Sequence, residues 1–284
     1  MNKKVSIARL SIISNSFLIV MKLAVGMISG SISIISEAIH SFMDLLASII
    51  AFFSVKISDT PADERHPYGH GKFENVSGVI EAVLIFVAAF WIIYEAVKKI
   101  VDPGEIENIS YGFIVMLISA VINFLVSRKL YKVAKETESI ALEADALHLK
   151  TDVYTSAGVA FGLLLIWVTG YHILDPIIAI LVALLILKES IELFLKAYSP
   201  LLDISLSVKE LETIKSIIEG HCTDKINFHG LRSRKAGNYN YVDFHLNLPE
   251  NLTVKEAHQI CDIIENDIKA NLKNTEVTIH VENF

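Results

Sequence analysis

The stretch Ala82–Ile93 reads AVLIFVAAFWII and contains no charged side chain. A second uncharged run, Ile177–Leu187, reads IIAILVALLIL. Together with a mean hydropathy of +0.49, these runs argue against a wholly soluble protein, and they contain too much apolar surface for a disordered one. A helix needs about 20 mostly apolar residues to cross a bilayer. Six segments satisfy this requirement: Ile7–Ile28, Ile32–Val55, Val76–Val97, Tyr111–Leu130, Ala141–Thr169 and Ile173–Leu195.

The composition changes after Ser199-Pro200, because the remaining residues carry frequent charges and no run long enough to span a membrane. We therefore predict a six-helix transmembrane domain over residues 1–200 and a cytoplasmic α+β domain over residues 201–284. The periodicities of the second domain predict the order αββαβ, with three strands and both helices on one face of the sheet. The elements expected are helices Ser207–Glu219 and Thr253–Leu272, and strands Phe228–Arg234, Tyr239–Leu248 and Glu276–Val281, with a turn at Lys235–Asn238.

Lysine and arginine gather in alternate connections between the predicted spans, and such residues favour the cytoplasmic side of a membrane. This bias predicts a multi-pass protein of the cell membrane (the inner or plasma membrane), with both termini in the cytoplasm. The residues concerned are Lys3, Lys4, Arg9, Lys56, Arg65, Lys72, Arg128, Lys129, Lys132 and Lys135.

Other classes of protein are disfavoured by charge and cysteine content. A net charge of −7 gives no electrostatic footprint for nucleic acid. Two cysteines cannot form a disulfide framework. No clear cleavage site of small residues follows the first apolar run, which is therefore expected to be a retained helix and not a signal peptide.

Two of the predicted spans contain the same polar pattern, an acid, Ala, an aliphatic residue, His, three further residues and Asp. The second span reads EAIHSFMD over Glu37–Asp44, and the fifth reads DALHLKTD over Asp145–Asp152. A His and an Asp four residues apart lie on one face of a helix. His40 and Asp44 from one helix, with His148 and Asp152 from the other, can thus supply two nitrogen and two oxygen ligands, a set that suits tetrahedral zinc.

The position of these residues strengthens the hypothesis of a metal site. Both motifs lie near the middle of the bilayer, on the second helices of two successive groups of three that run in opposite directions, as in an inverted repeat. A lone intramembrane His or Asp could simply link helices by hydrogen bonds. Two matched pairs would be a wasteful way to do so, since an Asp at the centre of a span costs about 2.5–3.5 kcal/mol. The roles of Glu37, Asp145 and Lys22 stay open: the two acids could support the imidazoles or lie near water at the helix ends, and Lys22 could snorkel or pair with an acid.

Two further groups could bind metal outside the membrane. Asp63, His66 and His70 lie in a loop with Pro and Gly residues, where an ordinary exposed loop is the alternative. The second domain is rich in His, although ordinary surface histidines would explain this too. His280 and Glu282 share a face of one strand, and His229, His245 and His258 lie on neighbouring elements, whereas His221 and His172 are not assigned a role.

Taken in order along the chain, the two H-x-x-x-D motifs, the D-x-x-H-x-x-x-H-G-K loop and the αββαβ tail resemble the cation diffusion facilitator family, close to its bacterial ferrous-iron and zinc efflux members. The resemblance implies a metallochaperone-like tail and a homodimer that exports divalent metal in exchange for protons. It also implies a transport site, an inter-helix loop site, a binuclear regulatory tail site and a charge interlock between Lys72 and Asp203. The residues matched to the first three are His40, Asp44, His148 and Asp152; Asp63, His66 and His70; and His229, His245, His258, His280 and Glu282.

The chain departs from the best-known bacterial members in two places. His40 stands where those members have Asp, as in the zinc-preferring branch, and Glu282 stands where Asp is usual. We expect Zn²⁺ as the transported and regulatory ion, with Cd²⁺, Co²⁺, Fe²⁺ and Mn²⁺ as other cations that the pattern admits. An intramembrane metalloenzyme and a membrane-anchored metal sensor are the alternatives. The enzyme is disfavoured because the chain lacks H-E-x-x-H and its four ligands would leave no open position for water.

Overall fold

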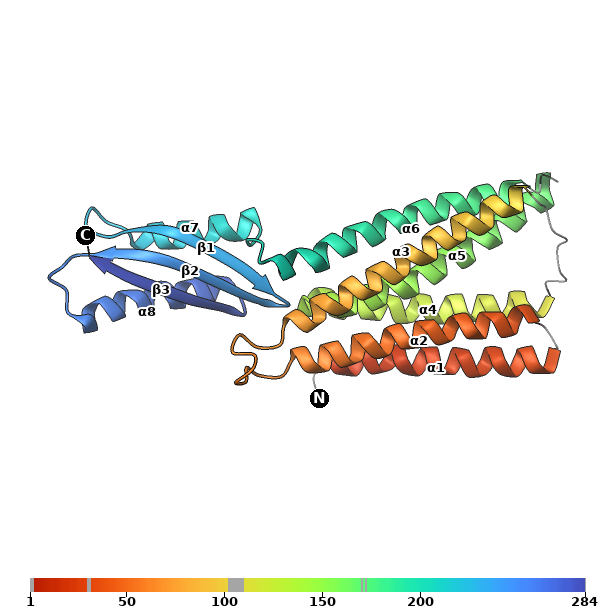
Figure 1. Ribbon diagram of the computed structural model, residues 1–284, viewed down its shortest axis with the longest axis horizontal. Coiled ribbons are helices and arrows are strands. Elements are labelled where there is room, and N and C mark those ends of the chain that lie inside the picture. The colour runs from red at the N-terminus through yellow and green to blue at the C-terminus, as the bar shows by residue number, and fades with distance from the viewer. Residues whose placement is uncertain (1–2, 30–31, 102–109, 170, 172, 284) are drawn as a thin grey trace. The chain divides into compact units, whose positions relative to one another are not determined.

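The computed structural model describes residues 3–29, 32–101, 110–169, 171 and 173–283. The chain divides into two compact units, Met1–Tyr198 and Ser199–Phe284. Six long helices form the first unit: α1 (Lys3–Ser29), α2 (Ile32–Ser58), α3 (Lys72–Val101), α4 (Ser110–Thr137), α5 (Ile140–Thr169) and α6 (Leu174–Tyr198). A 3₁₀ turn, Ser199–Leu202, begins the second unit. These six helices correspond to the six predicted spans, and their order can be followed by colour in Figure 1.

Small residues allow the long helices to approach one another closely. α1 packs against α2, α3 against α6, and α4 against α5, while α5 also contacts α2 and α3. Ala47, Ala51, Ala82, Ala144 and Ala183 are completely buried at these contacts. Alanine at a helix interface lets the two backbones come near each other, which favours association when lipid and side chain are equally apolar. Within the described residues, Lys3–Ile28 and Lys72–Val101 are long and apolar enough to span a membrane by length and composition alone.

The third helix begins four residues before the predicted span, at Lys72 and not at Val76. The polar composition of its first turns placed them outside the predicted span, yet Glu74, Asn75 and Ser77 are buried against other helices. The Asn75 side-chain amide donates to the backbone carbonyl of Ala197, at 3.2 Å. Hydropathy missed this part of the helix because it cannot register polar groups that are satisfied inside a bundle.

The second unit is a three-stranded sheet with two helices on one face, as predicted. It contains α7 (Val208–His221), β1 (Asn227–Ala236), β2 (Tyr239–Leu248), α8 (Val254–Asn271) and β3 (Thr275–Asn283). The central strand, β2, is antiparallel to β1 and parallel to β3. Capping boxes at Ser207 with Glu210 and at Thr253 with Glu256 begin the two helices.

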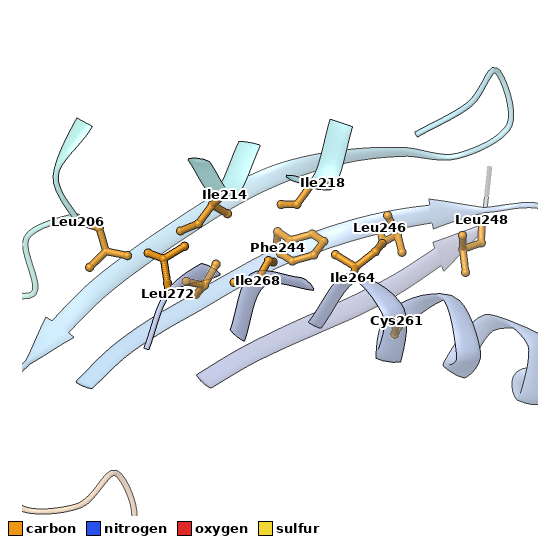
Figure 2. Packing of buried hydrophobic residues seen from close by; sticks show 11 residues of the cluster. Leu206, Ile214, Ile218, Phe244, Leu246, Leu248, Cys261, Ile264, Ile268 and Leu272 are labelled. Atoms are coloured by element: carbon orange, nitrogen blue, oxygen red, sulfur yellow. The ribbon is translucent and has the colours of Figure 1, made fainter. Parts of the chain in front are cut away.

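The alternation along β2 produces the core of this unit. Val242, Phe244, Leu246 and Leu248 are buried on one face, against α7 and α8, as Figure 2 shows for the latter three. Tyr241, Asp243, His245 and Asn247 alternate with them and thus lie on the opposite face.

The predicted hairpin turn, Lys235–Asn238, was too long. Lys235 and Ala236 pair with Asn240 and Tyr239, so that the strands are joined by Gly237 and Asn238 alone. Gly237 has φ 61°, a conformation that glycine adopts without strain. The ladder extends through residues of weak strand propensity because inter-strand hydrogen bonds outweigh that local preference.

Candidate metal-binding sites

The two repeated motifs of the first unit meet at Asp44 and His148. His148 Nε2 of α5 lies 3.0 Å from Asp44 Oδ1 of α2, and both side chains are largely buried. His40 lies in α2 one turn before Asp44, but its side chain is outside the described part of the structure. Asp152 lies one turn after His148 on α5 and accepts a hydrogen bond of 3.1 Å from the Asn123 amide of α4. Tertiary packing thus joins the two motifs through one residue of each.

A network of serine and asparagine supports this contact. Ser48, one turn after Asp44, donates to Asp145 Oδ1 at 2.9 Å, and Asn15 of α1 donates to the Ser48 hydroxyl at 2.7 Å. Asp145 is therefore buried and does not lie near water, and Ser48 is its hydrogen-bond donor within the described residues. Lys22 is buried as well, and it donates to the Ser41 hydroxyl at 2.8 Å.

Glu81 of α3 is a buried carboxyl that the sequence reasoning did not single out. Its exposed fraction is 0%, and the Ser77 hydroxyl donates to its Oε1 at 3.1 Å. Glu81 lies immediately before the apolar run Ala82–Ile93, and in the sequence it appears only to mark the end of that run. The available signal was its position immediately before Ala82, seven residues after Glu74 and 14 residues before Glu95, the neighbouring charged residues of α3.

The loop between α2 and α3 gathers three candidate ligands. Donor atoms of Asp63, His66 and His70 all lie within 4.8 Å of one another. The two carboxyl oxygens of Asp63 face different rings, at 3.2 Å from His66 Nδ1 and 3.4 Å from His70 Nε2. The backbone N–H groups of His66 and Arg65 donate to Asp63 Oδ1 at 2.6 and 2.9 Å. These hydrogen bonds, chiefly the one from the His66 backbone, hold the pKa of Asp63 below its usual value. The carboxylate is therefore ionised and can bind a cation.

Gly69 shapes this loop, which leads to a first prediction. Its φ is +79°, and its N–H donates to the carbonyl of His66 at 2.9 Å. A Cβ at Gly69 would meet nothing within 4 Å, so Gly69→Ala adds backbone strain of about 1 kcal/mol without a clash. We expect the variant to bind zinc at the loop about fivefold more weakly, as titration of the full chain would measure.

A matched substitution tests whether the effect belongs to the loop. Gly220→Ala also places its Cβ in open space, but Gly220 has no positive φ. This control should leave the titration unchanged, and the loop component is identified as the one that His70→Ala removes. Equal affinities for Gly69→Ala and the wild type would show that the loop geometry does not govern binding.

The second unit gathers a third group on the face of the sheet opposite its core. His229, His245 and His280 are partners across the three strands, and each lies near Glu282. The Glu282 carboxyl is 2.8 Å from His245 Nδ1, 3.5 Å from His229 Nε2 and 3.7 Å from His280 Nε2. Donor atoms of His229, His245 and Glu282 lie within 4.8 Å of one another. The Glu282 carboxylate therefore lies within 3.7 Å of an imidazole nitrogen from each of the three strands.

His258 and Asp203 have partners within the second unit that the sequence did not predict, and the interlock of Asp203 with Lys72, a residue of the first unit, stays a prediction. His258 lies on α8, whose helix covers the core face, and its Nε2 is 3.6 Å from Asp262 and outside the His229–His245–Glu282 group. Asp203 is 3.5 Å from Arg234 within the second unit. His221, to which no metal role was assigned, is 2.7 Å from Asp267.

Comparisons with known proteins define the class of this chain. Residues 8–202 match the family model of the cation efflux transmembrane domain, and residues 206–284 match that of the cation efflux protein cytoplasmic domain. An uncharacterised transporter of Synechocystis sp. is 36% identical, over 92% of this chain and 84% of its own length. The cation-efflux pump FieF of Shewanella oneidensis is 32% identical, over 96% of this chain and 92% of its own. The solved metal-bound C-terminal domain of the CzcD transporter from Thermotoga maritima is 25% identical, over 28% of this chain and 94% of its own, with a TM-score of 0.25.

These matches span nearly the whole chain and both of its units. The protein is a membrane transporter of metal cations, and it belongs to the cation efflux, or cation diffusion facilitator, family. The members of this family are transporters and not enzymes, which removes the intramembrane metalloenzyme considered above.

Proposed function

We propose that this chain exports Zn²⁺ from the cytoplasm in exchange for protons, with His40, Asp44, His148 and Asp152 as the transport site. The observation that carries the proposal is the 3.0 Å contact between Asp44 of α2 and His148 of α5. It joins two helices that bear the same His-x-x-x-Asp motif, and it does so in a region with little exposure to solvent. Two imidazoles and two carboxylates are a donor set that zinc accepts in tetrahedral geometry.

The charges of the site suit a doubly charged cargo. Two carboxylates neutralise the two charges of the ion, which lowers the free energy of holding it within hydrocarbon. Metal binding requires neutral imidazole and ionised carboxyl groups, so protons leave as the ion arrives. Histidine, with an ordinary pKa of about 6.5, can then take up protons from the outer side and weaken the site.

Alternating access follows from the arrangement of the helices in this proposal. The two motif helices would belong to inverted repeats, and rocking of one helix group against another would open the same site to each side in turn. The transmembrane domain would extend over residues 1–200, with both chain termini in the cytoplasm. The loop group of Asp63, His66 and His70 would be a separate metal site close to the cytoplasmic end.

The cytoplasmic domain, residues 201–284, would bind metal and hold two protomers together. The chain carries a domain of the type that dimerises in this family, which supports a homodimer. Zinc at His229, His245, His280 and Glu282 would act as a regulator if it binds the two transport conformations unequally. His258, which lies away from these residues within one chain, would contribute only by way of a second protomer or a rearrangement.

A charge-removing substitution separates the tail site from the transport site. Glu282→Gln keeps the size of the side chain but removes the charge shared by the surrounding histidines. We expect zinc affinity at the tail to fall by about 10- to 100-fold, as equilibrium titration would measure, while zinc still binds at the transport site. Glu276→Gln, on the same face of β3, is the matched control and should bind as the wild type does. Unchanged affinity in the Glu282 variant would remove this residue from the tail site.

Metal uptake into proteoliposomes under a pH gradient tests the function as a whole. The full chain should move Zn²⁺ when protons can flow in the opposite direction, and flux should fall when the gradient is collapsed. Competition with Cd²⁺, Co²⁺, Fe²⁺ and Mn²⁺ would establish the preference among metals. A chain that binds zinc but shows no flux in these vesicles would be a metal sensor and would refute the proposal.

A further inference from the structure

The two halves of the helical unit share more than their His-x-x-x-Asp motifs. In each half, a Ser and an Asn four residues apart precede the motif and a further Ser follows it, at the same spacings. The first half contains Ser11, Asn15, His40, Asp44 and Ser48, and the second contains Ser119, Asn123, His148, Asp152 and Ser156. The two asparagines lie on α1 and α4, the first helix of each half, and therefore occupy equivalent positions.

Each of these asparagines reaches the Asp of its own half, which follows it by 29 residues. Asn15 Nδ2 donates to the backbone carbonyl of Asp44 at 3.4 Å, and Asn123 Nδ2 donates to the carboxyl Oδ2 of Asp152 at 3.1 Å. Both asparagines are buried, with exposed fractions of 2% and 5%. The first helix of each half is therefore in contact with a candidate metal ligand that the second helix carries.

The two halves differ in what the asparagines bind. Asn15 also donates to the Ser48 hydroxyl at 2.7 Å, whereas Asn123 donates to a carboxyl oxygen of Asp152. The amide oxygen of Asn123 is buried and has no hydrogen-bond partner within the described residues. An amide that merely linked two helices would be a poor choice here, because its unpaired oxygen loses its bonds to water without replacement. The burial of this amide is better explained by the carboxyl group that it binds.

The chemistry of this hydrogen bond suits the support of a metal ligand. Each oxygen of a carboxylate has two lone pairs, so Asp152 can accept from Asn123 and still bind a metal ion. The amide is neutral, so the two carboxylates of the proposed site still match the charge of a divalent ion. The bond restricts rotation of the Asp152 side chain, and partners of this kind orient a ligand before the ion arrives.

We propose that Asn123 is a positioning residue of the transport site, which from α4 holds the Asp152 carboxylate in the orientation that binds the transported divalent cation. This inference rests on the proposed function, in which Asp152 is a ligand. Asn123 acts through Asp152 and does not bind the ion. The transport site thereby depends on α4 as well as on the two helices that carry the His-x-x-x-Asp motifs.

Asn123→Leu tests this role, because leucine fills a similar volume but cannot donate a hydrogen bond. All titrations use a parent chain with His70→Ala and Glu282→Gln, so that the loop and tail groups do not mask the transport site. We expect the Kd for Zn²⁺ to rise about tenfold. The KM for zinc uptake into proteoliposomes should rise with it, while the maximal rate stays within about twofold of the parent chain.

Ser127→Ala is the matched control for helix packing. Ser127 lies one turn from Asn123 on α4 and donates to the backbone carbonyl of Ala146 on α5 at 2.7 Å. Its substitution removes a hydrogen bond between the same two helices, and unfolding in SDS measures the resulting loss of stability. The Kd and the KM for zinc should stay those of the parent chain. An equal rise of Kd in both variants would mean that Asn123 only links the helices, and would overturn the inference.

A double-variant cycle shows whether Asn123 acts through Asp152. In a chain with Asp152→Ala, adding Asn123→Leu should change the remaining zinc affinity by less than about twofold, because the partner of the amide is gone. A further large loss would mean that Asn123 binds the ion itself, and would overturn the positioning role. If Asp152→Ala weakened binding but Asn123→Leu did not, only this inference would fail. An unchanged Kd in the Asp152→Ala chain would refute the proposed transport site and the inference with it.

Discussion

Asp44→Asn is expected to reduce zinc transport by at least about a hundredfold. Asparagine keeps the shape of the side chain and can still hydrogen-bond to His148, 3.0 Å away. It removes the negative charge that would both bind the ion and compensate its charge within the membrane. Initial rates of uptake into proteoliposomes measure the effect, and zinc titration of the same preparation should show weaker binding at the transport site.

The same substitution at an exposed site provides the reference for this experiment. Asp224→Asn changes an exposed carboxylate in the second unit, away from the metal-binding residues proposed here, and should transport as the wild type does. His40→Ala and Asp152→Ala should resemble Asp44→Asn while the protein still inserts and folds. Uptake close to wild type in the Asp44 variant would mean that the contact with His148 merely links two helices.

Glu74→Gln is expected to lower the free energy of unfolding of the helical unit by about 3 kcal/mol. Lys4 of α1 lies 2.9 Å from Glu74 Oε1, and both side chains are almost completely buried. Ser58 of α2 donates to the same oxygen at 2.8 Å, and Ser139, just before α5, donates to the other. Loss of the carboxylate weakens the neutralisation of a buried ammonium group, although Asp59 remains 3.4 Å from it.

Unfolding by SDS in mixed micelles would measure this loss of stability. Glu95→Gln, an exposed position on the same helix, serves as the control and should be neutral. A double variant, Lys4→Met with Glu74→Leu, should be less destabilised than Glu74→Gln, because it leaves no uncompensated buried charge. If the Glu74→Gln variant and the wild type unfold at the same SDS concentration, the buried pair does not stabilise the bundle.

The buried contacts of Glu74 with Lys4, Ser58 and Ser139 also affect the metal-binding loop between α2 and α3. Glu74 and Ser58 flank the loop that carries Asp63, His66 and His70, and they tie its two ends to α1 and to the start of α5. The loop ligands are therefore attached to a rigid framework. Rigid attachment favours binding because fewer conformations are lost when the metal binds.

Local patterns predicted the elements of this protein well. Apolar runs identified the six helices because the length of a membrane span is set by the thickness of the bilayer. Alternation along β2 predicted its buried face, including Phe244 and Leu246, since side chains in a strand alternate between faces. Capping boxes at Ser207 and Thr253 marked helix starts because the bonds involved are local.

The sequence by itself therefore determined the class of the protein, the order of its elements and the His-x-x-x-Asp faces. Only the tertiary structure decided which residues meet: that Asp44 contacts His148, that Glu282 serves three histidines on paired strands, and that His258 lies apart from them. It also revealed that Glu74, Glu81 and Asp145 are buried. The physical reason is that periodicity specifies the face of one element, whereas the partner of that face depends on packing between segments far apart in the chain.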